Sequence, residues 1–186
     1  MQRFPELKLE QMTSMQQKVA REIAAGPRGG LRGPFNAWLR CPELADLWQK
    51  VGEYIRFHSS LPRSLNELAI LITARVWTAQ FEWYAHYKLA MEAGLSPAIA
   101  AAIAEGRRPE AMSDDERIVY DFCTELQEKK SVGDAAYAAA VGRFGEQGVV
   151  ELISACGYYT AVSMTLNVAD VAVPDDSVPR LKKLPG

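Results

Sequence analysis

Apolar residues recur at intervals of three and four along most of this 186-residue chain, which is the spacing of one face of an α-helix. A stripe from Met12 to Ile23 shows this spacing first, and Gly26-Pro27 ends it. Hairpin dipeptides between alternating apolar runs, which would indicate strands, do not occur. The pattern therefore predicts an all-α fold, built as one multi-helix bundle.

Capping and helix-breaking residues set the expected bounds of the later helices. Pro42 can occupy a first turn, Ser96-Pro97 and Ser113 can cap helices, and Gly145 can close one. We expect helices over about residues 42–57, 65–93, 97–105, 134–144 and 147–169, and a further helix that begins at about residue 114. From Val173 on, we expect an extended tail.

The predicted helix over residues 42–57 carries a clear apolar face. We expect this face to be buried, and it consists of Leu44, Leu47, Trp48, Val51 and Ile55.

Composition excludes several classes of protein. A net charge of −2 without a Lys/Arg block argues against binding to nucleic acid or an anionic membrane. We see no uninterrupted apolar run long enough for a membrane span and no apolar signal segment. Three scattered cysteines, without a CxxC pair or metal-ligand spacing, suit reduced thiols in the cytoplasm. We expect a cytoplasmic protein without a metal.

The Gly/Pro-rich segment GPRGGLRGPF, residues 26–35, is predicted to be a loop. It lacks the GK[ST] ending of a phosphate-binding loop, and no strand precedes it. A nucleotide site is therefore not expected there.

Glu82 and His86 stand four residues apart in an otherwise apolar stretch, so on a helix they share one face. A carboxylate and an imidazole there can tune each other's pKa for general acid–base chemistry. Structural explanations are also open: Glu82 could be a solvated partner of Lys88, and His86 a hydrogen-bonded core residue. The nearby aromatic residues, Trp83 among them, are more typical of a core.

Glu67 has two possible roles. In Ser64-Leu65-Asn66-Glu67 it fits a capping box that opens the helix. In one straight helix Glu67 would lie about 28 Å from His86, at about 1.5 Å per residue. A break near Val76-Trp77-Thr78 would bring the two residues together, although neither Gly nor Pro forces one.

The order of these segments, including CPELADLW, LNELAIL and FEWYAHYKLAMEAGL, resembles the carboxymuconolactone decarboxylase family of the alkylhydroperoxidase D-like superfamily. The resemblance covers about residues 30–175, with residues 1–29 as an N-terminal helix and loop and 176–186 as a tail. It implies an all-helical homo-oligomer, a trimer or a hexamer. In the peroxidase branch a Cys-x-x-Cys pair lies between the glutamate and the histidine, but Ala79 and Glu82 occupy those positions here.

The resemblance to the decarboxylase branch implies a lyase that removes carboxylate from a small carboxylated lactone without a cofactor. Its catalytic group would be His86 as general acid/base, with Glu82 or Glu67 as partner. Arg75 or Arg56 would supply a cation for the substrate, and Trp83 would lie beside it.

Two alternatives stay open. One is a hydroperoxidase-like antioxidant, which the missing CxxC disfavours, since Cys156 alone supports at most one-cysteine chemistry. The other is an oligomer that binds a small acid without catalysis.

Overall fold

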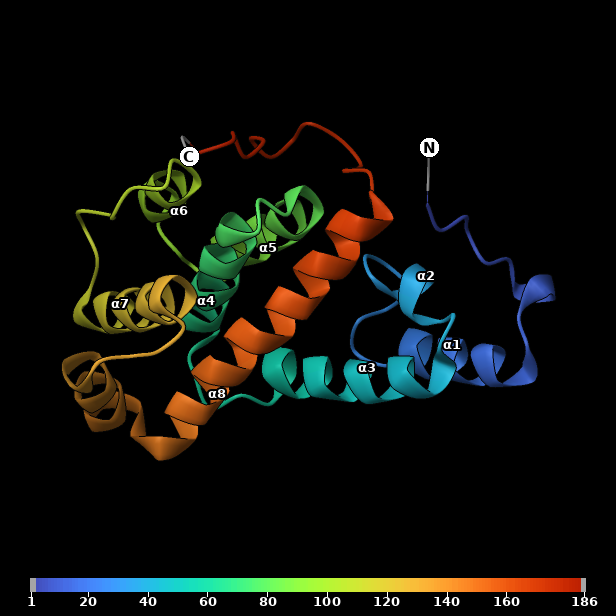
Figure 1. Ribbon diagram of the computed structural model, residues 1–186, viewed down its shortest axis with the longest axis horizontal. Coiled ribbons are helices and arrows are strands. Elements are labelled where there is room, and N and C mark those ends of the chain that lie inside the picture. Colours follow the sequence, from blue (N-terminus) through green and yellow to red (C-terminus); the bar gives the residue numbers. More distant parts are fainter. Residues whose placement is uncertain (1–2, 185–186) are drawn as a thin grey trace.

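The computed structural model describes residues 3–184, and within them every regular element is a helix (Figure 1). This confirms the predicted all-α class. The elements are η1 (Leu9–Gln11), α1 (Ser14–Ala25), α2 (Phe35–Trp38), α3 (Pro42–Phe57), α4 (Arg63–Val76), α5 (Gln80–Glu92), α6 (Pro97–Ala104), α7 (Asp114–Lys129) and α8 (Asp134–Ala169).

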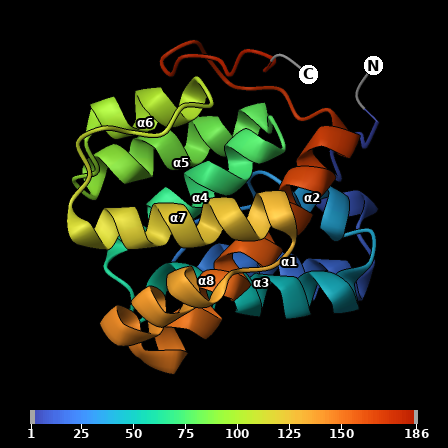
Figure 2. The same ribbon diagram turned by 60° about the vertical axis from the view of Figure 1, so that its left-hand side comes forward.

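Helix α4 is the centre of the bundle. Every residue from Leu65 to Arg75 is buried, because α5, α7 and α8 pack around it. A helix covered on all sides must be apolar nearly all round, as this one is. In Figure 1, α1, α2 and α3 lie on one side of α8, and α5, α6 and α7 lie on the other; Figure 2 shows the same grouping. Helix α1 packs on α3, so the N-terminal segment is part of the same body.

A sharp turn separates α4 from α5 and positions the candidate site. Helix α4 ends at Val76, Trp77 caps it, and Thr78 has a φ of +46° in the left-handed region. The chain then reverses, so α5 packs back along α4. The break that the sequence left open is therefore present, and residues 67 and 86 lie side by side.

Helix α8 consists of two helical segments that meet at Gly145, whose φ of 70° and ψ of 175° are not helical. This confirms the predicted closure at that glycine. Among the described residues, α8 is the one helix long and apolar enough to span a membrane. However, 56% of its most apolar stretch is buried in the bundle, which is typical of a core helix of a globular protein.

The predicted buried face of α3 is wrong in part. Leu44, Leu47 and Val51 are 47%, 62% and 45% exposed, whereas Ile55 is buried. The inward face of α3 instead carries small or polar side chains beside Ile55, which are Ala45, Gln49 and Gly52. An apolar stripe predicts that these side chains favour a contact away from water, but it does not identify the contact. No described residue of the same chain covers this stripe.

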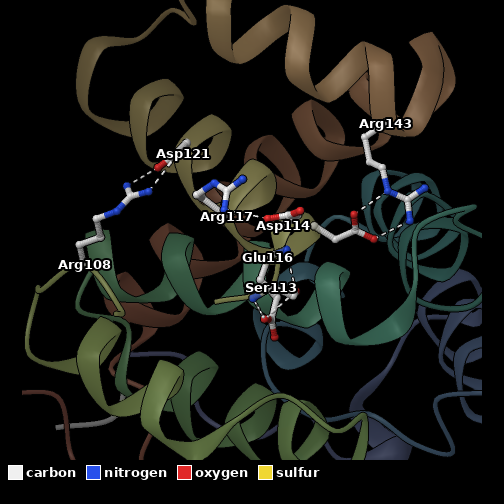
Figure 3. Close-up of polar contacts among 8 residues, drawn as sticks. Arg108, Ser113, Asp114, Glu116, Arg117, Asp121 and Arg143 are labelled. Atoms are coloured by element: carbon white, nitrogen blue, oxygen red, sulfur yellow. Dashed lines mark hydrogen bonds and ion pairs between the residues drawn. The ribbon is translucent and has the colours of Figure 1, made fainter. Parts of the chain in front are cut away.

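The N-terminus of α7 is fixed by polar contacts (Figure 3). Ser113 and Glu116 form the predicted capping box. The carboxylate of Asp115 accepts hydrogen bonds from Arg143 at 2.5 and 2.7 Å, which links α7 to the first segment of α8. Arg108 pairs with Asp121 and ties the α6–α7 loop to the middle of α7. These exposed pairs order the outer face and contribute little energy individually.

The C-terminal segment after α8 docks on the α4–α5 hairpin. The Gln80 side chain donates to the carbonyl of Leu181 at 2.8 Å and accepts from its amide at 3.0 Å. Val178 and Leu181 are buried. Although this segment has no regular secondary structure, it covers the turn between α4 and α5.

Candidate functional site

Two carboxylates from the α4–α5 hairpin converge on one imidazole. The Nδ1 atom of His86 lies 2.6 Å from Glu67 Oε2, and its Nε2 atom lies 3.1 Å from Glu82 Oε1. Glu82 and His86 share a face of α5, as their spacing predicts, and Glu67 comes from the antiparallel α4. Both glutamates therefore contact the histidine.

The expected capping box at Ser64 is wrong. Helix α4 begins at Arg63 with Pro62 as its N-cap, and no side chain caps it. Since Glu67 therefore lies beyond the third helical position, its carboxylate is directed to His86 instead of the helix terminus.

All three groups are buried, with 4%, 3% and 5% exposure for Glu67, Glu82 and His86. Burial by itself lowers the pKa of His86, because it disfavours the charged imidazole. The charges of Glu67 and Glu82 and their hydrogen bonds outweigh this effect and raise the pKa to about 9. At neutral pH His86 is therefore an imidazolium, which donates from Nδ1 to Glu67 and forms an ion pair with Glu82 through Nε2.

This trio opens into a cavity of about 640 Å³. Glu82 and His86 line the cavity, whereas Glu67 lies behind them and lines a second cavity of about 390 Å³. Glu82 or His86 can therefore transfer a proton to a ligand bound in the cavity.

The cavity wall carries more cations than carboxylates. Its basic side chains are Arg28, Arg32, Arg56 and Lys88, and its acidic ones are Glu82 and Glu92. Within residues 3–184, no carboxylate lies within 4.0 Å of the three arginines. Such a wall favours an anionic ligand.

Of the three predicted substrate-binding residues, the structure brings one to the cavity. Arg56 lines both cavities. The guanidinium of Arg75 instead donates to the carbonyls of Ala104 and Lys182, at 3.2 and 2.8 Å. Trp83 is 2% exposed and packs beside Tyr87 in the core, away from the cavity wall.

Sequence analysis did not identify Arg28, Tyr158 and Tyr159 as part of the site. Tyr159 meets the His86 ring edge to face at 4.9 Å between centroids, and burial raises its pKa well above the usual value. Burial likewise raises the pKa of Tyr158 to about 12, so both phenols stay protonated. The Gly-Tyr-Tyr sequence at 157–159 gives no signal that distinguishes cavity residues from core residues.

Among residues 3–184, no thiol lines the cavity. Ala79, at one of the positions where the peroxidase branch has cysteine, is fully buried. Cys123 and Cys156 are both buried between α7 and α8. The neighbouring Cys156 thiol and burial raise the pKa of Cys123, which keeps that thiol protonated and weakly nucleophilic.

Part of the chain matches the model of a known protein family. Residues 42–117, which include Glu67, Glu82 and His86, match the family model described as the Carboxymuconolactone decarboxylase family. The match covers less than half of the chain and leaves out the 26–35 loop and α8. No curated protein matches the chain.

Proposed function

We propose, from the match of residues 42–117 to the carboxymuconolactone decarboxylase family model, that the protein is a cofactor-independent carbon–carbon lyase. Its substrate would be a small carboxylated lactone or a related acid. The observation that carries the proposal is the buried Glu67–His86–Glu82 trio at the wall of a cationic cavity.

The chemistry needs an electron sink and a proton. The bond between the carboxylate and the carbon skeleton breaks, carbon dioxide leaves, and the electron pair moves through a double bond into the lactone carbonyl. The resulting dienolate takes a proton on carbon. A neighbouring cation stabilises the negative charge that develops on the lactone oxygen.

The trio supports the proton step. The imidazolium of His86 holds a proton at neutral pH, Glu82 contacts its Nε2 atom, and both residues line the cavity. The proton passes from Nε2 to the substrate carbon, either directly or through Glu82. Glu67 holds the ring from the other side and balances its charge, which makes it a positioning residue.

Arg56 supplies the cation. It lines the cavity with His86 and Glu82 and has no ion-pair partner among the described residues. A free guanidinium can take a carboxylate in a bidentate pair or stabilise an enolate oxygen. An uncompensated arginine would be an unusual neighbour for a purely structural acid–base pair.

We also propose that the protein is a homo-oligomer. Exposed apolar residues form a stripe on α3, which is Leu44, Leu47, Val51 and Tyr54. A second stripe on α8 has the spacing of a helix-packing face and consists of Val150, Ile153, Met164 and Val168. The two stripes adjoin, because the Tyr54 hydroxyl donates to Glu151 of α8 at 2.8 Å. Two copies that cover this face would remove it from water.

The decisive experiment is turnover of 4-carboxymuconolactone, followed as loss of its ultraviolet absorbance. We expect the wild type to consume it and His86→Ala to lose at least about 10²-fold in kcat, which is the usual contribution of a general acid. His58→Ala is the matched control, because the sequence has two histidines and His58 lines neither cavity. Absence of turnover by the folded wild type would refute this substrate class.

A further inference from the structure

Arg28 is a cavity residue that lies outside the segment matched by the family model. It belongs to the Gly/Pro-rich loop between α1 and α2, and with Gly30, Arg32 and Gly33 it forms one wall of the cavity. The loop is therefore part of the site, although its sequence fits no nucleotide-binding motif.

The guanidinium of Arg28 is held without being neutralised. It lies over the buried Phe35 ring, with its central carbon 5.4 Å from the ring centroid. It donates to the carbonyl of Gln49 at a long 3.5 Å and also lies in hydrogen-bond contact with the Tyr158 side chain. Its Nε atom is buried and has no partner among the described residues. The Nε atom of Arg75 is unpaired within residues 3–184 as well, but Arg28 differs from Arg75 in lining the cavity, where an anionic ligand can supply the missing countercharge to its outer nitrogens.

Gly52 on α3 makes room for this arrangement. A Cβ atom there would lie 2.1 Å from the Tyr158 hydroxyl and 2.3 Å from the Nη2 atom of Arg28. Both side chains therefore depend on the missing methyl group, and they meet at the same point of the cavity wall. A phenol that stays protonated and a guanidinium together offer donors to one anionic group.

We propose that Arg28 and Tyr158 form the subsite that binds the second carboxylate of a small dicarboxylate ligand. One carboxylate would pair with Arg56 and the other with Arg28 and Tyr158, across the aromatic side chains Phe81 and Tyr84. This specifies the substrate class of the site proposed above and rests on that proposal only for the claim of catalysis.

Equilibrium binding tests the subsite without requiring turnover. Titration calorimetry with isophthalate, a planar dicarboxylate, is compared with benzoate, its monocarboxylate counterpart. We expect the wild type to prefer isophthalate, and Arg28→Gln to weaken isophthalate by roughly 10–100-fold, the usual effect of a lost charge-assisted pair. Benzoate should change by less than about threefold, because Arg56 is still present.

Two further variants separate position from charge. Gly52→Ala retains every charge but displaces Arg28 and Tyr158, so it should show the same selective loss. Arg21→Gln removes an exposed arginine of α1 that does not line the cavity, and it should bind both ligands like the wild type. Circular dichroism confirms that each variant is folded.

Three results would overturn the subsite: no saturable binding of isophthalate by the wild type, an unchanged isophthalate Kd in Arg28→Gln, or equal weakening of both ligands. Binding that depends on Arg28 without turnover of any lactone would instead refute the proposed lyase activity alone. Turnover that survives Arg28→Gln with the same KM would refute the subsite alone.

Discussion

The imidazole of His86 lies between two buried carboxylates, and that placement decides its charge. One carboxylate would form an ordinary buried pair, but two make the protonated ring the stable form at neutral pH. The trio then carries two negative charges and one positive charge. The unpaired arginines of the cavity wall offset the remaining negative charge, so an anionic ligand can approach.

The raised pKa of His86 makes stability depend on pH with a definite sign. Its folded-state pKa of about 9 exceeds the unfolded value of 6.5, so its contribution is complete below pH 6.5 and disappears as pH rises through 9. The shift corresponds to roughly 3 kcal/mol as an order of magnitude. Urea unfolding of wild type and His86→Gln should therefore give free energies that converge between pH 6 and 10. Parallel curves would contradict the ion-paired imidazolium, and His58→Gln should retain the slope of the wild type.

At the scale of the elements, the α4–α5 turn creates the site, because it places Glu67 opposite His86. Arg75 fastens this turn: it donates to Thr78 Oγ1 at 2.8 Å and to carbonyls of α6 and of the C-terminal segment. Burial lowers the pKa of Arg75, and its two Nη atoms donate to neutral acceptors, while its buried Nε has no partner among the described residues. Its position gives it a structural role, which is distinct from the expected role in substrate binding.

Replacing Arg75 by Met should separate these roles. The variant leaves buried carbonyls without their donor, so we expect a loss of about 2–4 kcal/mol in the free energy of unfolding. Its Kd for isophthalate should stay within about twofold of the wild type, since distant sites act independently. Urea denaturation and calorimetry measure the two quantities. A stable Arg75→Met protein with weakened binding would restore Arg75 as a substrate residue.

The sequence predicted helices well wherever a local signal marks their ends. Pro42, Ser96, Ser113 and Gly145 act within a turn of the chain, so their effect does not depend on the rest of the fold. The α4–α5 break was left open because Thr78 adopts a left-handed conformation without Gly or Pro. There the packing of α5 against α4 outweighs local preference.

The site shows the same division. The Glu82–His86 contact follows from helical spacing, whereas the contact between Glu67 and His86 depends on the α4–α5 hairpin. The predicted capping box was wrong because Ser64 has the residue type and spacing of an N-cap but lies inside α4. Arg28 and Tyr158 reach the cavity from segments far apart in sequence, and only the packed bundle brings them together. Arg56 and Arg75 look alike in sequence, and only the folded chain shows that Arg56 lines the cavity whereas Arg75 binds neutral acceptors beside the α4–α5 turn.

At the scale of the whole molecule, large apolar side chains of α3 and α8 are left exposed on the surface. The stripes on α3 and α8 expose large apolar side chains in adjoining rows, although residues of this kind usually fill a core. The expectation that Leu44, Leu47 and Val51 are buried fails within one chain, but it would hold in an assembly that covers α3. The apolar residues of α3 that were wrongly predicted to be buried within one chain are therefore of the kind that a subunit interface requires.

Charge placed on either stripe should break the assembly. Light scattering after size exclusion should show a wild-type mass of several chains, because the exposed apolar side chains of the two stripes leave water when copies associate. Leu47→Glu and Ile153→Glu each bury a charge at that face, so each should shift the mass toward one chain. Leu9→Glu changes a similarly exposed leucine of η1, away from both stripes, and should retain the mass of the wild type. A monodisperse wild-type monomer would refute the proposed homo-oligomer, and an oligomer insensitive to both charges would move the interface to another face.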